Sequence, residues 1–152
     1  MPRIDVVSEA IIDASPMEVY KAFLDEISGV TNWWMPHMKY TLIGDVPIDH
    51  EGAVFDAIIN PTSRMNAKFS SKVTKIVEGE LLEDDITGCF LGTGKWTFEP
   101  TEDGKTKVQF RINAKTNGII YSIFAPFVSY EKNHRNVMEK GFKQLNSYLS
   151  KK

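Results

Sequence analysis

The chain has 152 residues, a formal net charge of −2 at pH 7, 42% hydrophobic residues and 25% charged residues. This length and balance predict a single folded domain over residues 1–152 with a sizeable core, and they exclude a disordered chain. The basic residues are scattered rather than gathered into one stripe, so we expect no nucleic-acid partner.

The first seven residues and the cysteine content indicate the compartment. A single cysteine, Cys89, excludes an internal disulfide. The opening MPRIDVV lacks the basic region and long apolar run of a secretory signal. The longest apolar run, GIIYSIFAPFV, is too short to cross a bilayer and contains a proline. We therefore expect a cytoplasmic protein without integral membrane association, as a monomer or weak dimer.

The N-terminal part predicts a strand and then a helix. Residues 4–13, IDVVSEAIID, have the composition of a β-strand. The following SPMEVYKAFLDEI is typical of a helix start, because Ser15 can cap it, Pro16 suits its first position and Glu18 completes an S-x-x-E capping box. The next piece, VTNWWMPHM, predicts a short second helix or a turn that stops before Pro36.

The middle of the chain is rich in strands separated by Pro, Gly and Asn. Four segments fit this description: MKYTLIGD, AVFDAIIN, KFSSKVTKIVEG and ELLEDDITG. The clearest unit is GTGKWTFEPTEDGKTKVQFRINAKT, in which apolar and polar residues alternate on both sides of the Asp103-Gly104 turn. It predicts an antiparallel hairpin with one wet face and one buried face, the latter formed by Trp96, Phe98, Val108, Phe110 and Ile112.

The chain ends in a long helix from about Phe127 to Leu149, after a short apolar segment that is interrupted at Pro126. Winding the helix at about 100° per residue gathers one apolar side, made of Phe127, Tyr130, His134, Met138, Gly141, Leu145 and Tyr148. His134 lies in the middle of this side, and Gly141 lies two turns further on. Such a pair indicates either a packing detail or the wall of a cavity.

The order of these elements indicates an α+β fold, with helices at the ends of an antiparallel sheet. Several motifs then occur in a familiar order: A-S-P-M-E-V-Y-K-A-F-L-D after the first strand, the turn W-W-M-P, the hairpin G-x-G-x-W-x-F-E-P and the long final helix. Across essentially its whole length the chain resembles the START-like or polyketide-cyclase-like (SRPBCC) superfamily.

The resemblance implies the helix-grip fold. We expect a curved antiparallel sheet of about six or seven strands wrapped around the long C-terminal helix, two short helices after the first strand, and a pocket between sheet and helix. Members of the superfamily bind sterols, lipids, plant hormones or polyketides. Some cyclise or dehydrate polyketide chains, and some activate a heat-shock chaperone, so the resemblance implies the fold more closely than the function.

His134 is the first candidate for chemistry. A polar group in an apolar pocket can orient a ligand carbonyl or hydroxyl, and an imidazole can act as acid or base near neutral pH. The alternative is a core histidine that is hydrogen-bonded to a strand. Tyr130, one turn earlier, either shares the site or lies at the sheet edge. Gly141 costs roughly 1 kcal/mol of helix stability relative to alanine, so either the helix packs very close to the sheet there or the missing side chain leaves room for a ligand.

The acidic run at residues 83–85 raises a second question. If its apolar flanks face the core, period-two alternation carries Asp84 inward. A buried carboxylate needs a partner, and His134 or a ligand hydroxyl would serve. The alternative is a bent or bulged strand that leaves all three acids in water. Asp56, which also has apolar flanks, raises the same question.

The aromatic residues fit either a filled core or a lined cavity, and Trp33 and Trp34 are candidates for the mouth of a pocket. The histidines at positions 37, 50 and 134 lack metal-ligand spacing, so we expect no metal and no other cofactor. The candidate ligand-binding residues are His134, Tyr130, Gly141, Met138, Phe127, Trp96, Phe98, Phe110, Trp33, Trp34 and Asp84.

Three functions remain open at this point. The first is binding of a small hydrophobic or amphipathic ligand, lipid-like or polyketide-like, between the sheet and the final helix. The second is an aromatase/cyclase-type enzyme with His134 as acid/base and Tyr130 or Asp84 assisting. The third is a co-chaperone-like interaction module that uses its surface.

Overall fold

The computed structural model describes residues 3–62, 66–116 and 130–151, apart from the side chains of Tyr130, Glu131 and Asn133. The elements in chain order are β1 (Arg3–Ile12), α1 (Pro16–Ile27), β2 (Met38–Ile43), β3 (Val54–Ile59), β4 (Ala67–Val77), β5 (Leu81–Gly88), β6 (Phe90–Pro100), β7 (Thr106–Thr116) and α3 (Tyr130–Ser150). The short apolar segment before Pro126 and the predicted start of the last helix at Phe127 lie outside the described part.

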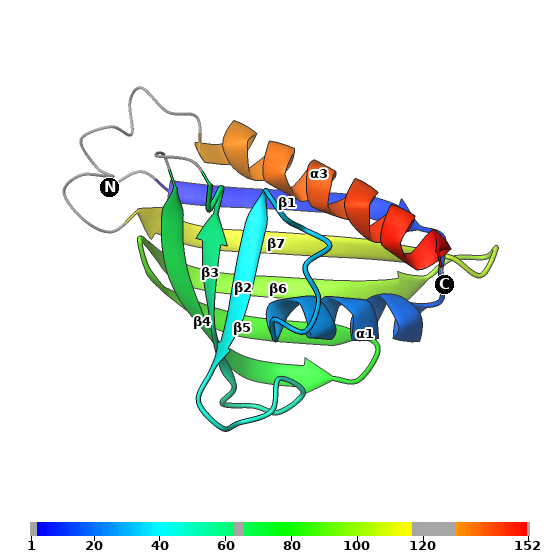
Figure 1. Cartoon of the computed structure of the whole chain (residues 1–152), viewed down its shortest axis with the longest axis horizontal. Helices are drawn as coiled ribbons and strands as arrows, with labels where there is room; N and C mark the ends of the chain where they lie inside the picture. Colours follow the sequence, from blue (N-terminus) through cyan, green and yellow to red (C-terminus); the bar gives the residue numbers. More distant parts are fainter. Residues whose placement is uncertain (1–2, 63–65, 117–129, 152) are drawn as a thin grey trace.

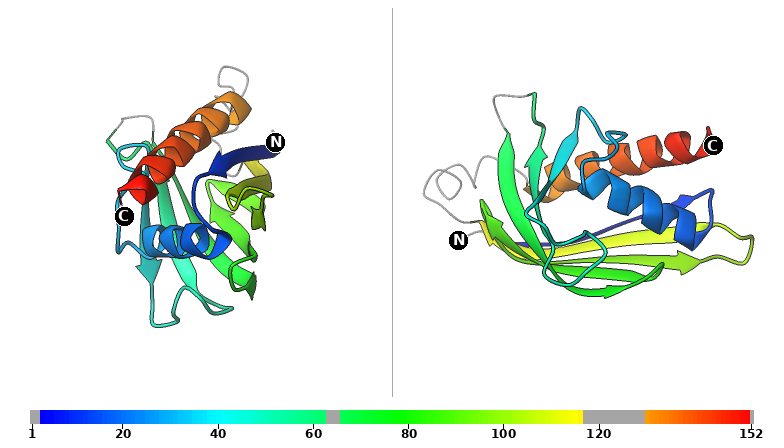
Figure 2. Two further views of the ribbon diagram at one scale, coloured as in Figure 1. Left: turned by 90° about the vertical axis from the view of Figure 1, so that its right-hand side faces the viewer. Right: turned by 60° about the horizontal axis from the view of Figure 1, so that its bottom comes forward.

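The seven strands form one antiparallel sheet in the order β1-β7-β6-β5-β4-β3-β2. The sheet curves strongly, and α1 and α3 both lie on its concave side (Figures 1 and 2). The buried apolar side chains of the sheet and the two helices form one continuous core between them. The predicted α+β helix-grip architecture is therefore confirmed.

Helix α1 begins as its sequence predicts. Ser15 is the N-cap, its Oγ accepts a hydrogen bond from the backbone N–H of Glu18, and Pro16 occupies the first position. The buried side of α1 includes Phe23, whose ring packs on Trp96 of the sheet with centroids 4.0 Å apart. This contact places α1 against one end of the concave face.

The predicted second short helix is not formed, and residues 33–37 make turns instead. The cause is Glu26 of α1, which is 2% exposed. Its carboxylate accepts hydrogen bonds from the backbone N–H groups of Trp33 (3.0 Å) and Trp34 (2.9 Å) and from Thr31 Oγ1 (2.7 Å). These bonds hold the chain in a turn, and the peptide bond before Pro36 is cis.

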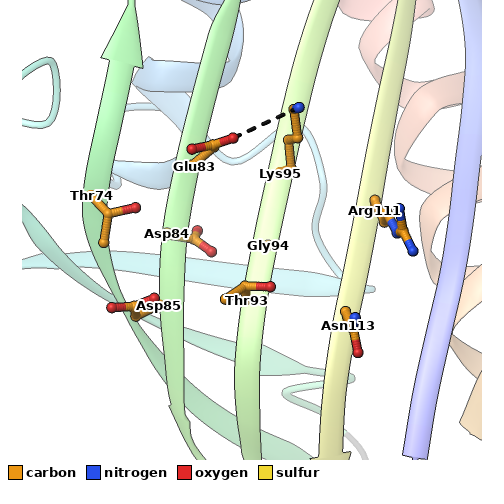
Figure 3. Close-up of a pocket in the computed structure, with 9 residues that line it drawn as sticks. All are labelled: Thr74, Glu83, Asp84, Asp85, Thr93, Gly94, Lys95, Arg111 and Asn113. Carbon is orange, nitrogen blue, oxygen red and sulfur yellow. Dashed lines mark ion pairs between the residues drawn. The ribbon is translucent and has the colours of Figure 1, made fainter.

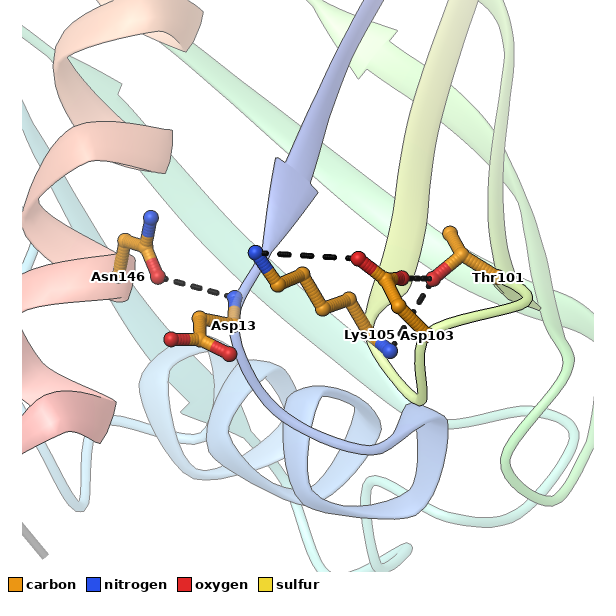
Figure 4. Close-up of polar contacts among 5 residues, drawn as sticks. All are labelled: Asp13, Thr101, Asp103, Lys105 and Asn146. Atoms are coloured by element: carbon orange, nitrogen blue, oxygen red, sulfur yellow. Dashed lines mark hydrogen bonds and ion pairs between the residues drawn. The ribbon is translucent and has the colours of Figure 1, made fainter.

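The β6–β7 hairpin is as predicted. Its inward positions alternate with outward polar residues, and Trp96 stacks on Phe110 with centroids 4.3 Å apart. At its turn Gly104 has a φ of +79°. Thr101 hydrogen-bonds Asp103, and the backbone N–H of Lys105 donates to Thr101 Oγ1 (Figure 4).

Helix α3 lies across the concave face with its predicted apolar side inward: Met138 and Leu145 are each 1% exposed. Its C-terminal half is tied to the end of β1, because Asn146 Oδ1 accepts a 3.0 Å hydrogen bond from the backbone N–H of Asp13 (Figure 4). Gln144 Nε2 donates to the carbonyl of Met35 at 2.8 Å. The helix is thus anchored at two places along its length.

Candidate functional site

The concave face of the sheet carries buried polar groups among its apolar ones. Ser8, Ser71, Asp84 and Thr116 face inward and are each 8% exposed or less. Within the described part of the chain, one side-chain oxygen of each has no hydrogen-bond partner. Buried polar groups without partners are unusual in folded proteins and mark places where another molecule or water completes the bonding. The interior is therefore the candidate site.

Asp84 is the most deeply buried acid of this face. Alternation along β5 turns it inward together with Leu82 and Ile86, and its exposure is 3%. The carboxyl group lies over Gly94 of the neighbouring strand β6, since a Cβ at position 94 would lie 2.5 Å from Asp84 Oδ1. The same Cβ would lie 3.1 Å from Phe110 Cε1. Glycine at position 94 therefore leaves the space that the carboxyl group occupies.

Of the two readings of the acidic run, the inward one is correct for Asp84, while Asp85 is exposed on the outer face. The sheet does contain a bulge here, but it lies in the partner strand β4, between Val73 and Lys75. Asp56 faces outward, because its neighbours Phe55 and Ala57 take the inward positions. Its Oδ1 accepts a 2.5 Å hydrogen bond from Ser70 Oγ.

The protonation of Asp84 is strongly perturbed. Burial raises the pKa of its carboxyl group to about 7; the charge of Asp85 raises this pKa further, while the Gly94 N–H and the Ser71 hydroxyl lower it. Ser71 Oγ and Asp84 Oδ1 have no hydrogen bond of normal geometry with any described residue, so we treat them as neighbours rather than as a bonded pair. At neutral pH the group can therefore either donate or accept a hydrogen bond.

Tyr40 completes this polar group. It lies on β2 with its ring 5.8 Å from that of Phe55 and 5.7 Å from that of Trp34, measured between centroids. Burial, followed by the negative charges of Asp84 and Glu26, raises the pKa of its hydroxyl well above the usual value. The phenol therefore stays protonated. We call Asp84, Ser71 and Tyr40 the Asp84 cluster.

His134 faces the sheet from α3 and packs on Phe110, with ring centroids 5.6 Å apart. Burial, and to a lesser degree the charge of Arg135, lowers the pKa of the imidazole to about 4, so it is neutral at pH 7. Its Nε2 has no hydrogen-bond partner among the described residues. Phe110 is the shared neighbour of His134 and Asp84, and no described hydrogen bond or ion pair joins the two.

The two tryptophans near the chain bend, candidates for the mouth of a pocket in the sequence, are buried in the core. Trp34 is 1% exposed and Trp33 is 9% exposed, and their rings stack with centroids 5.4 Å apart. Each indole N–H donates to a carbonyl, that of Ala22 for Trp33 (3.3 Å) and that of Val137 for Trp34 (3.1 Å). Both are anchors of the core, because their polar atoms are satisfied inside it.

The ring of Trp34 leaves no room for a side chain at position 141. A Cβ at position 141 would lie 2.1 Å from Cε2 and 2.2 Å from Nε1 of the indole. Glycine at position 141 therefore allows close packing, as one of the two alternatives predicted, although the helix packs on an indole ring rather than on the sheet. The space beside Gly141 is filled by this ring and leaves no room for a ligand. Trp96 and Phe98 are also packed by other rings, those of Phe23 and Tyr20 among them.

A polar depression of about 350 Å³ lies on the convex face of the sheet (Figure 3). Most of the lining side chains face outward and carry both charges, and the inward-facing Asp84 and its neighbour Gly94 also contribute to the lining. Glu83 and Lys95 form an ion pair of 3.7 Å there, and Arg111 donates to both carboxylate oxygens of Asp5 at 3.2 Å. Exposed pairs of this kind contribute little to stability.

The described residues contain no group of three or more His, Cys, Asp or Glu side chains that could hold a metal ion. No helix in the described ranges is long and apolar enough to cross a membrane. Sequence reasoning missed Ser8, Ser71, Tyr40 and Thr116. The one sequence signal for these residues is strand alternation, since residues two apart on a strand face the same side. Ser71, for example, is two residues before the apolar Val73.

The family described as "Polyketide cyclase / dehydrase and lipid transport" matches residues 3–149. The chain belongs to this family. The resemblance seen in the sequence is thereby confirmed, and the family accounts for the curved sheet that encloses a long final helix.

Solved structures share the fold at low sequence identity. A START superfamily protein from Mycobacterium smegmatis has a TM-score of 0.71 at 11% identity, covering 97% of each chain. Ara h 8.0201 has a TM-score of 0.68 at 14% identity, covering 99% of this chain and 100% of its own. Protein CV1439 from Chromobacterium violaceum has a TM-score of 0.67 at 15% identity, covering 95% and 96%. No curated protein sequence matches the chain.

Proposed function

We propose that this protein binds a small amphipathic molecule in its interior, between the concave face of the sheet and α3. The observation that carries the proposal is the set of buried, unpartnered polar atoms on both walls: Ser8, Ser71, Asp84 and Thr116 on the sheet and His134 on the helix. Leaving such atoms without partners is unfavourable by about 1–3 kcal/mol each. A ligand that supplies hydrogen bonds within an apolar surround would offset this.

The family description agrees with a ligand of this kind, because both polyketides and lipids are largely apolar molecules that carry a few oxygen atoms. The walls offer the matching surfaces. Aromatic rings such as Phe110 and Phe55 supply apolar contact, and the Asp84 cluster and His134 supply polar contact from opposite sides.

The test is direct binding. Protein purified under gentle conditions would be examined by native mass spectrometry for a bound organic mass, and then titrated with neutral amphiphiles. Tryptophan fluorescence reports on the interior, since Trp33, Trp34 and Trp96 are all buried. We expect saturable binding that His134→Leu weakens and that Arg135→Ala, at the exposed neighbouring position, does not. Absence of both a bound mass and any saturable binding would refute the proposal.

One observation favours a second candidate function, catalysis of an aldol cyclisation or dehydration. A general acid or base works best when its pKa lies near the operating pH. The pKa of Asp84, about 7, meets this condition, whereas that of His134, about 4, makes the imidazole a weak base. We therefore assign the acid/base role in this alternative to Asp84 rather than to His134.

Variants distinguish the two candidates. If the protein is an enzyme, Asp84→Asn abolishes turnover of a poly-β-ketone thioester while the affinity for a non-reactive analogue persists. If it is a binder only, the wild type shows no turnover. The third function, a surface interaction module, has no comparable support, because the exposed apolar residues are spread over β1, α1, β2, β4 and the loops near them.

A further inference from the structure

The polar anchor of the interior is acidic. Asp84 and Ser71 are 3% and 2% exposed, and one oxygen of each lacks a partner among the described residues. Tyr40 adds a buried hydroxyl-bearing residue on the same concave face. These polar groups are all oxygen atoms, and one of them can carry a negative charge. They therefore cannot form an ion pair with an anionic ligand, as a lysine or arginine side chain could.

The positive charges of the protein lie elsewhere. None of the Lys and Arg side chains that the structure describes is buried. Those on the strands occupy outward positions, for example Lys72 on β4, Lys95 on β6 and Arg111 on β7. Outside the described residues the sequence holds only two basic side chains, Arg64 and Lys152. The described interior thus offers no cation to balance a ligand carboxylate.

We propose that the Asp84 cluster makes the interior selective for the charge of its ligand, so that it accepts neutral amphiphiles bearing a hydroxyl group and rejects the corresponding carboxylates. This inference rests on the proposed function and specifies its ligand class. A hydroxyl group can donate to Asp84 and accept from Ser71 on the adjacent strand, so it can bond to either protonation state of the acid. A carboxylate can only accept, and it binds beside Asp84 only when that group is protonated.

The discrimination should therefore vary with pH in a defined way. The pKa of Asp84, about 7, lies inside the accessible range. Tyr40 and His134 keep their protonation state between pH 6.0 and pH 8.5, since the pKa of Tyr40 is well above 10 and that of His134 is about 4. Glu26, the remaining buried acid near Tyr40, is held by three hydrogen bonds from the turn after α1.

The experiment uses two matched ligand pairs, 1-octanol with octanoate and 2-naphthol with 2-naphthoate, titrated calorimetrically into the wild type at pH 6.0 and pH 8.5. If a carboxylate binds only the protonated form, its Kd rises about 30-fold between these pH values, given a pKa of about 7. The Kd of each alcohol should stay nearly constant. The preference for the alcohol is then largest at pH 8.5.

Two variants separate the role of Asp84 from surface charge. Asp84→Asn removes the titrating group, and we expect it to abolish the pH dependence of carboxylate binding. Asp85→Asn is the matched control, because Asp85 is the exposed neighbour on the other face of the same strand, and it should behave like the wild type. Should Asp84→Asn fail to fold, the pH dependence of the wild type still decides the matter.

The binding results distinguish the charge selectivity from the binding function itself. Carboxylates that bind as tightly as the alcohols at pH 8.5, or with a Kd independent of pH, overturn the charge selectivity and leave the proposed binding function standing. A wild type that binds none of the four ligands at either pH overturns both. A pH dependence that Asp85→Asn removes and Asp84→Asn preserves assigns the effect to the convex surface, and it also contradicts the inference.

Discussion

Replacing Asp84 by asparagine should change how the stability of the protein depends on pH, even without a ligand. In the folded protein the pKa of Asp84 is about 7, and in the unfolded chain it is about 3.9. Between these values the folded state binds the proton more tightly, so the free energy of unfolding falls as the pH rises. From pH 5 to pH 8 the linkage relation gives a fall of about 2.5 kcal/mol.

His134 acts in the opposite sense. Its pKa is about 4 in the folded protein and about 6.5 in the unfolded chain, so between these values the unfolded state binds more protons. The free energy of unfolding then rises with pH, by about 2 kcal/mol between pH 5 and pH 8. In the wild type the two effects nearly cancel, and their sum is a change of less than about 1 kcal/mol.

Urea denaturation at pH 5 and pH 8 measures these changes. For Asp84→Asn we expect the free energy of unfolding to rise by about 2 kcal/mol over this range, because the contribution of His134 is then no longer offset by that of Asp84. Asp85→Asn, at the exposed neighbouring position, should follow the wild type. Groups other than residue 84 contribute equally to both proteins, so the difference isolates this residue. If Asp84→Asn and the wild type change in parallel, Asp84 is not the perturbed acid described above.

Three further substitutions test the packing and the second polar wall. His134→Leu should make the free energy of unfolding fall by about 2.5 kcal/mol from pH 5 to pH 8, as only Asp84 then contributes; an unchanged pH dependence would show that His134 is not buried as a neutral base. Gly141→Ala should lower the free energy of unfolding by at least about 2 kcal/mol, because the added Cβ would lie 2.1 Å from Trp34 Cε2. Ser147→Ala, on the exposed side of α3, is the control. A Gly141→Ala protein that is more stable than the wild type would contradict this packing. Glu26→Ala should lower the free energy of unfolding by about 3 kcal/mol or more, because three hydrogen bonds to a buried carboxylate are lost. A Glu26→Ala protein that denatures like the wild type would show that Glu26 does not stabilise the turn.

The sequence predicts the fold well because its signals are local. The capping box that begins at Ser15, the Asp103-Gly104 turn and the alternation around Trp96 each specify an element through nearby residues. The sequence left VTNWWMPHM open between a short helix and a turn, and the turn forms for a non-local reason. The turn at residues 33–37 depends on the carboxylate of Glu26, which approaches from a different element.

The candidate site was predicted only in part, because it depends on distances between elements. Helical periodicity placed His134 inward correctly, and strand alternation offered the inward position of Asp84 as one of two readings. Sequence could not show that Gly94 makes room for the carboxyl group of Asp84, or that an indole fills the space beside Gly141. Both facts concern residues that are far apart in the chain or on different strands.

The most direct test of ligand binding in the interior is a methyl NMR titration of methionine-labelled protein with 1-octanol and 2-naphthol. Met138 lies on α3 one turn after His134 and is 1% exposed, whereas Met17 lies on α1 and is 38% exposed. We predict a saturable shift of the Met138 methyl signal while that of Met17 stays in place. A Met138 signal that does not move at saturating concentrations of either compound, or a shift confined to Met17, would contradict binding between the sheet and α3.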